Sequence, residues 1–180
     1  MSLEQIYVFI KLAASVLVIA GMTGFGFYES RRLGERLKIL KELYRLTALL
    51  RSEIQYTALP VPEAVSRIAE RTTGTFKAFL EAVAAQLCLQ SGETLAQVWD
   101  LQVQAHFGDS PLKTEDIRLL KEVGNNLGYG DRRSQLGAVE LCLENFRTAI
   151  GQLEKNVPAK KRLYRCMGIF SGLMAVILLV

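Results

Sequence analysis

The sequence KKRLYRCMGIFSGLMAVILLV, residues 160–180, decides how the rest of the chain is organised. A basic cluster opens this stretch, and an uncharged apolar run from Cys166 to Val180 follows it. Long apolar runs flanked by basic residues are typical of helices that enter a membrane. The stretch therefore predicts a C-terminal transmembrane segment over residues 166–180.

A second apolar run, residues 12–28, lies near the other end of the chain and is followed by Arg31, Arg32 and Arg36. Its start carries Glu4 and few basic residues, and its end is bulky, which is not the pattern of a cleaved signal peptide. We therefore expect three parts: a transmembrane anchor over residues 1–30, a helical-bundle domain over residues 31–165, and the C-terminal segment.

The basic residues predict which side of the membrane the middle domain occupies. Both apolar runs have their basic flanks on the side of the middle domain, and the C-terminal flank includes Lys160, Lys161, Arg162 and Arg165. Such flanks lie on the cytoplasmic side of a membrane. The middle domain is therefore expected in the cytoplasm of a membrane-attached protein.

Both apolar runs contain a pair of small residues four positions apart. Gly168 and Gly172 form a GxxxG pattern, and Ala20 and Gly24 have the same spacing in the first run. Small residues at this spacing let membrane helices approach closely, although glycine is also common in membrane helices in general. A helix over residues 167–180 would be about 21 Å long against a hydrocarbon core of about 30 Å, so packing against another helix would support it.

The middle domain reads as helical throughout. Between residues 31 and 56, leucine and isoleucine recur in steps of three and four, at positions 33, 37, 40, 43, 46, 50 and 54. This spacing places one apolar stripe on a long helix that could continue unbroken from the first apolar run. Further helices are expected over residues 62–71, 76–90 and 93–105, from Thr114, and from Asp131, with Thr75 and Thr114 as N-caps. The predicted fold class is an all-α antiparallel helical bundle.

The sequence offers no catalytic, cofactor or metal motif. His106 is the only histidine, no phosphate-binding glycine loop is present, and Glu115 and Asp116 read as first-turn helix charges. The three cysteines, Cys88, Cys142 and Cys166, lie among apolar neighbours and read as small buried residues. The net charge is +4, and the basic residues gather beside the apolar runs rather than on a nucleic-acid-binding face. We therefore expect no enzyme, no cofactor and no nucleic-acid partner.

The turn over residues 127–135 combines helix signals with unexplained polar residues. Gly128 and Gly130 suit the end of one helix, and Asp131 suits the N-cap of the next. Arg132 and Gln135 lie outside the apolar stripe, and a cation in a first helical turn is slightly unfavourable. Either an intramolecular carboxylate or a partner protein could hold Arg132 there.

Four stretches together resemble the stage III sporulation protein AB family over nearly the whole chain. They are Thr23-Gly24-Phe25; Glu53-Ile54-x-Tyr56 with Pro60 and Glu63-Ala64; Leu127-Gly128-x-x-Asp131-Arg132-x-x-Gln135; and the basic cluster leading into Gly168 and Gly172-Leu173. We take Glu53, Asp131, Arg132 and Gln135 from these stretches as candidate protein-interface residues.

The resemblance implies a membrane component of the channel-like complex between mother cell and forespore in endospore-forming bacteria. It also implies a helical domain similar to those of type II secretion F proteins. The partners it implies are the lipid bilayer, other channel components and a cytosolic secretion-type ATPase, and a homo-oligomer is compatible with it. The leading hypothesis is a non-enzymatic assembly platform in the mother-cell membrane. The alternative is a membrane-anchored adaptor or regulatory domain that binds a partner helix and has no part in transport.

Overall fold

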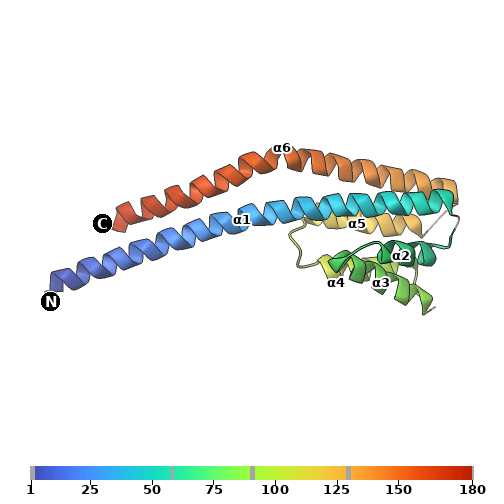
Figure 1. The fold of residues 1–180 in the computed structure, drawn as a ribbon, viewed down its shortest axis with the longest axis horizontal. Coiled ribbons are helices and arrows are strands. Elements are labelled where there is room, and N and C mark those ends of the chain that lie inside the picture. The colour runs from blue at the N-terminus through green and yellow to red at the C-terminus, as the bar shows by residue number, and fades with distance from the viewer. Residues whose placement is uncertain (1–2, 58, 90–91, 129–130, 180) are drawn as a thin grey trace. The chain divides into compact units, whose positions relative to one another are not determined.

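A computed structural model describes the backbone of residues 3–57, 59–89, 92–128 and 131–179. It describes their side chains except for residues 3–19, 22–23, 160–161, 164–165, 167–169, 171–173 and 175–179. The helices are α1 (Leu3–Tyr56), α2 (Val61–Glu70), α3 (Gly74–Cys88), α4 (Leu95–Phe107), α5 (Thr114–Leu127) and α6 (Arg132–Leu179) (Figure 1). The described residues contain no strand, which confirms the all-α prediction.

The chain divides into two compact units. One, the end unit, combines the N-terminal residues up to Glu35 with the C-terminal residues from Leu153, and the other, the helical domain, is Arg36–Gln152. The sequence-based division placed these boundaries after residues 30 and 165. Helix α1 starts in the end unit and continues without a break into the helical domain, as the absence of proline predicted.

Helix α1 supplies the central stripe of the domain's core. Leu40, Leu43, Leu46, Leu50 and Ile54 are all buried, because steps of three and four return a side chain to the same face of a helix. These residues were all expected on the apolar stripe. Burial of such side chains contributes about 1.5–3 kcal/mol each.

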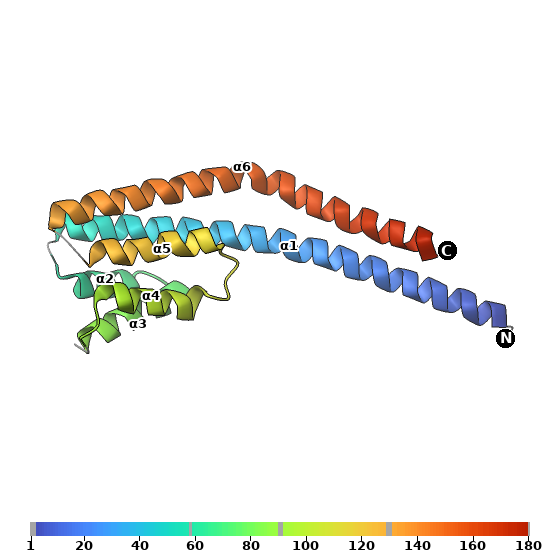
Figure 2. The same ribbon diagram turned by 180° about the vertical axis from the view of Figure 1, so that it is seen from behind.

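Helices α5 and α6 lie alongside the domain segment of α1 (Figures 1 and 2). Arg51 of α1 pairs with Glu140 of α6 at 2.6 Å, and Arg132 at the start of α6 reaches the carbonyls of Ile54 and Gln55. Residue numbers thus rise along α6 as they fall along α1, so these two helices are antiparallel.

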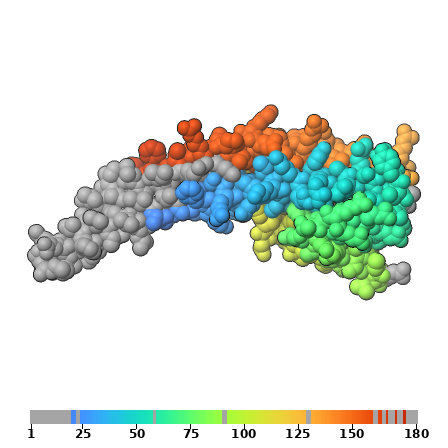
Figure 3. Space-filling view, in the orientation of Figure 1, coloured from blue at the N-terminus to red at the C-terminus, as the bar shows by residue number. Residues whose placement is uncertain are grey.

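Helices α2, α3 and α4 form the other side of the domain core. Consecutive pairs from α2 to α5 pack against each other, and Figure 3 shows α2 and α3 closing over this face beneath α1. Trp99 of α4 donates its indole N–H to the carbonyl of Leu120 of α5 at 2.8 Å. Gly124 permits this contact, because a Cβ there would lie 2.1 Å from Trp99 Cγ.

Three helix starts and two cysteines differ from the sequence-based predictions. Helix α3 begins at Gly74 and α5 begins at Thr114, so neither Thr75 nor Thr114 is an N-cap. Helix α4 instead has a capping box in which Thr94 and Gln97 exchange hydrogen bonds. The Thr-x-x-Gln spacing is typical of such a box, but the sequence-based predictions did not include it. Cys142 is buried as expected, but Cys88 and Cys166 are exposed.

Within the residues that the structure describes, no helix combines the length and the apolar composition needed to cross a membrane. Most side chains of the two expected transmembrane segments, residues 1–30 and 166–180, lie outside the described set, as do Gly168 and Gly172. Ala20 and Gly24 are described and exposed, and no described residue outside the neighbouring backbone of α1 approaches the Cβ position of Gly24 within 4 Å.

Candidate protein-interaction surface

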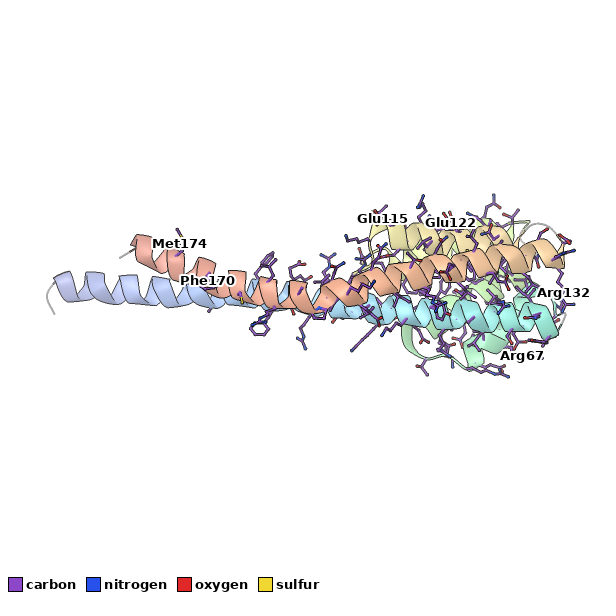
Figure 4. The ribbon with its side chains drawn as sticks, turned by 90° about the horizontal axis from the view of Figure 1, so that it is seen from above. Arg67, Glu115, Glu122, Arg132, Phe170 and Met174 are labelled. Atoms are coloured by element: carbon purple, nitrogen blue, oxygen red, sulfur yellow. The ribbon has the colours of Figure 1, made fainter. Side chains whose placement is uncertain are left out.

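The four candidate interface residues come together around the C-terminal end of α1. Glu53 lies on the last turn of α1, Asp131 directly precedes α6, and Arg132 and Gln135 lie on the first turn of α6. Figure 4 shows Arg132 at this end of the domain, with Arg67 of α2 at the same end. The sequence did not identify Arg67 as part of this site.

Asp131 and Gln135 complete helix ends. The Asp131 carboxylate accepts hydrogen bonds from the Ser134 N–H at 3.3 Å and from the Ser134 hydroxyl. These bonds hold the pKa of the Asp131 carboxyl below its usual value, the hydroxyl being the main cause. Asp131 is therefore the N-cap of α6, as predicted. Gln135 donates its side-chain N–H to the carbonyl of Leu127 at 3.1 Å and so satisfies the end of α5.

Arg132 is held within the chain, but not by a carboxylate. Its Nε donates to the carbonyl of Ile54 at 2.8 Å, and an Nη donates to the carbonyl of Gln55. The last carbonyls of a helix have no partner within the helix and favour a nearby cation. Arg132 thus caps the end of α1, which accounts for its place in the first turn of α6 without a partner protein.

Glu53 differs from the other three candidates because one oxygen of its buried carboxylate lacks a hydrogen bond from a described residue. The residue is 9 % exposed, and its carboxylate lies 3.6 Å from Arg67 Nη1 and 3.9 Å from Arg71 Nη1. Both distances exceed a hydrogen bond, and Oε2 is buried without a hydrogen-bond partner among the described residues. The two arginines are four residues apart on α2, a spacing that places them on one face and could have drawn attention to them.

A second buried carboxylate, Asp116, lies at the other end of the domain segment of α1. It accepts hydrogen bonds from Arg36 Nε at 2.7 Å and Nη2 at 3.0 Å, and from the N–H of Lys113 at 2.8 Å. Asp116 is thus a first-turn helix charge, as expected, and also joins α5 to α1. The partner Arg36 was not predicted.

His106 and Cys142 are two further titratable residues whose surroundings the structure describes. His106 Nδ1 lies 3.0 Å from the carbonyl of Gln102 one turn earlier on α4. Burial raises the pKa of the Cys142 thiol, which disfavours the reactive thiolate. No cluster of three metal-ligating side chains occurs in the part of the chain that the structure describes.

The family model described as stage III sporulation protein AB matches residues 11–180. Stage III sporulation protein AB of Bacillus subtilis (strain 168) is 24 % identical over 170 residues, which cover 94 % of this chain and 99 % of that protein. A solved structure of stage III sporulation protein AB is similar with a TM-score of 0.63 and 24 % identity, over 68 % of this chain and 96 % of that one. Because the family model matches nearly the whole length, the chain belongs to the stage III sporulation protein AB family.

Proposed function

We propose that this chain is a non-enzymatic, membrane-anchored platform of the channel-like, secretion-like complex that joins mother cell and forespore during endospore development. In this proposal both chain ends lie in the mother-cell membrane, and the helical domain lies in the mother-cell cytoplasm. There it binds a secretion-type ATPase and supports assembly of the other channel components, in the manner of type II secretion F domains.

The observation that carries the proposal is the exposure of large apolar side chains on both parts of the end unit. Phe25, Phe27 and Tyr28 come from α1, and Leu163, Phe170 and Met174 come from α6; each is more than half exposed (Figure 4 labels Phe170 and Met174). Apolar patches of this kind mark surfaces that a membrane or another protein covers. The neighbouring basic residues suit the anionic surface of a cytoplasmic leaflet.

The helical domain supports the assembly role in a different way. Its most buried acidic groups, Asp116 and Glu53, contact arginines of other helices, and the buried indole of Trp99 bonds a backbone carbonyl. These polar groups therefore join helices to each other. This use of buried polar groups favours a domain that acts through its surface over one that carries out chemistry in its interior.

Crosslinking of the tagged full-length chain in membranes of sporulating cells tests the proposed function. We expect a short-arm amine crosslinker to join it to a secretion-type ATPase and to other stage III channel components, identified by mass spectrometry. Membranes from vegetative cells that express the same tagged chain are the control. Recovery of peptides from regulatory proteins alone would support the adaptor alternative and overturn the platform.

Thiol labelling tests the cytoplasmic position of the domain. Cys88 is exposed on the domain, so in a Cys166→Ser background we expect it to react with a membrane-permeant maleimide and to resist an impermeant one in intact cells. Cys142 is the internal control, because it is buried and should resist both reagents. Ready labelling of Cys88 by the impermeant reagent would reverse the orientation.

A further inference from the structure

Arg67 and Arg71 lie near the end of α1, and no hydrogen bond to a described residue holds either guanidinium. Their side chains are 44 % and 62 % exposed, and among the described residues each approaches only Glu53, at 3.6 Å and 3.9 Å. Arg132, by contrast, is held by two carbonyls. The planar N–H donors of Arg67 and Arg71 are therefore available to another group, and arginine is well suited to a carboxylate.

The buried carboxylate of Glu53 gives this arginine pair a fixed place. Two guanidinium groups one turn apart repel each other, and an acid between them offsets that repulsion. Glu53 supplies one negative charge against two positive charges, so the cluster keeps an excess of one positive charge. Because both contacts with Glu53 are longer than a hydrogen bond, moving either arginine toward a new carboxylate breaks no hydrogen bond to a described residue.

Two exposed acids on the same helix restrict what the cluster can bind. Glu63 and Glu70 lie four residues before and three residues after Arg67, yet neither forms an ion pair with it. A polyanion such as a nucleic acid or an anionic membrane surface would be repelled by these acids. A protein surface can instead place acidic side chains opposite the arginines and basic or neutral ones opposite the glutamates.

An exposed aromatic residue lies close to Glu53 in the chain. Tyr56 follows Glu53 by three residues on α1 and is 76 % exposed. Tyrosine and arginine are the residue types that most often dominate the binding energy of protein interfaces. The end of α1 thus combines a large exposed ring with two arginines that keep free donors.

We propose that Arg67, Arg71 and Tyr56, with Glu53 holding the arginines, form the docking site for an acidic surface segment of a protein partner. This inference rests on the proposed function, since that partner is the secretion-type ATPase that the platform binds. Glu53 occupies the arginines in the unbound domain, and the partner's carboxylates bind them in the complex. Arg132 supports the end of α1 and does not contact the partner.

Site-specific photo-crosslinking of the full-length chain in sporulating cells tests the docking site. A photo-reactive amino acid replaces Ser66, an exposed residue next to Arg67, and a matched control replaces Gln104 on the exposed side of α4. We expect an adduct between position 66 and an ATPase peptide that carries at least two acidic residues. Position 104 should give less of this adduct.

Charge variants separate binding from folding. In the variant with Glu53→Gln, Arg67→Gln and Arg71→Gln, all three charges are removed together, so no buried charge is left without a partner. We expect at least about a tenfold loss of the position-66 adduct. Its melting temperature should stay within about 4 °C of the parent chain. The single Glu53→Gln variant should give more adduct than the parent, because the Glu53 charge then no longer competes with the partner's carboxylates for the arginines, whereas a purely structural role predicts no gain.

Each outcome decides a specific point. A lipid adduct, an adduct with a second copy of this chain, or an ATPase adduct that survives the triple variant would overturn the docking site. An ATPase adduct at position 104 but not at 66 would also overturn it, and the proposed function would stand. Absence of the ATPase from every crosslink, including those of the amine reagent, would overturn the ATPase part of the proposed function and this inference with it.

Discussion

Two buried carboxylates contact arginines at opposite ends of the domain segment of α1, and they are held very differently. The Asp116 side chain is 2 % exposed and its partner Arg36 is 12 % exposed, with the closest N–O distance at 2.7 Å. The Glu53 side chain is 11 % exposed, but its partners are 44 % and 62 % exposed and no closer than 3.6 Å. Both contacts thus pair a carboxylate with arginine, but only the Asp116 contact is closely hydrogen-bonded and buried on both sides.

The difference follows from what each buried charge needs. Removing a carboxylate from water costs several kcal/mol, which hydrogen bonds and an opposite charge must offset. Asp116 receives three hydrogen bonds, two from Arg36 and one from the N–H of Lys113. Glu53 Oε2 receives none from a described residue, and both of its arginines are exposed to water. The Asp116–Arg36 contact therefore joins α5 to α1, whereas the contacts of Glu53 leave N–H donors of its two arginines available to a partner.

The largest expected effect comes from breaking the closed contact. Arg36→Ala leaves Asp116 buried without its cation, so we expect a loss of about 3 kcal/mol in the free energy of unfolding. Chemical denaturation of the full-length chain in a mild detergent measures it. Lys38→Ala, at an exposed position two residues away, is the matched control and should change stability by less than about 0.5 kcal/mol. A similar loss in both variants would show that the ion pair is not what holds this end of α1.

Gly124→Ala tests whether packing also fixes α5, the helix that carries Asp116. The new Cβ would lie 2.1 Å from Trp99 Cγ and 2.4 Å from Cδ1, so Trp99 must move from its place beside Leu120. We expect a loss of about 2 kcal/mol. Gly137→Ala on α6 is the control, because no described atom beyond the neighbouring helix backbone lies within 4 Å of its Cβ position, and it should stabilise the domain by up to about 1 kcal/mol. If both variants lost the same amount of stability, the loss for Gly124→Ala would not be evidence of tight packing at Gly124.

Arg132→Ala distinguishes the cap of α1 from the docking site. It removes two hydrogen bonds to the carbonyls of Ile54 and Gln55, and we expect a loss of about 1 kcal/mol. Arg133→Ala, at the next and exposed position, should have little effect on unfolding. The yield of ATPase adduct per folded molecule should be unchanged by Arg132→Ala. A loss of adduct without a loss of stability would instead place Arg132 in the interface.

The sequence predicted those features that depend on local patterns. The stripe from Leu40 to Ile54 follows from periodicity, and the cap at Asp131 follows from a residue type with a local hydrogen-bonding habit. Contacts between distant residues leave no such pattern. Arg36 and Asp116 are 80 residues apart, and Arg132 binds carbonyl groups, which every residue carries. The close approach of Trp99 to Gly124 depends in the same way on how two helices pack.

We expect the smallest effect on stability from Glu53→Gln, which also tests the comparison of the two buried carboxylates most directly. This change keeps the shape of the side chain and removes a buried charge whose Oε2 has no hydrogen-bond partner among the described residues. Its long ion pairs involve arginines that water already solvates, so they contribute little after screening. The relief of desolvation offsets part of that small loss. We therefore expect the free energy of unfolding to stay within about 0.5 kcal/mol of the parent chain.

Asp116→Asn in the same denaturation series is the matched isosteric control and should cost clearly more, because Asp116 accepts two hydrogen bonds from Arg36. A loss for Glu53→Gln as large as that for Asp116→Asn would show that Arg67 and Arg71 are structurally committed to Glu53. In that case they would not be free to bind a partner, and the two ends of the domain would be equivalent.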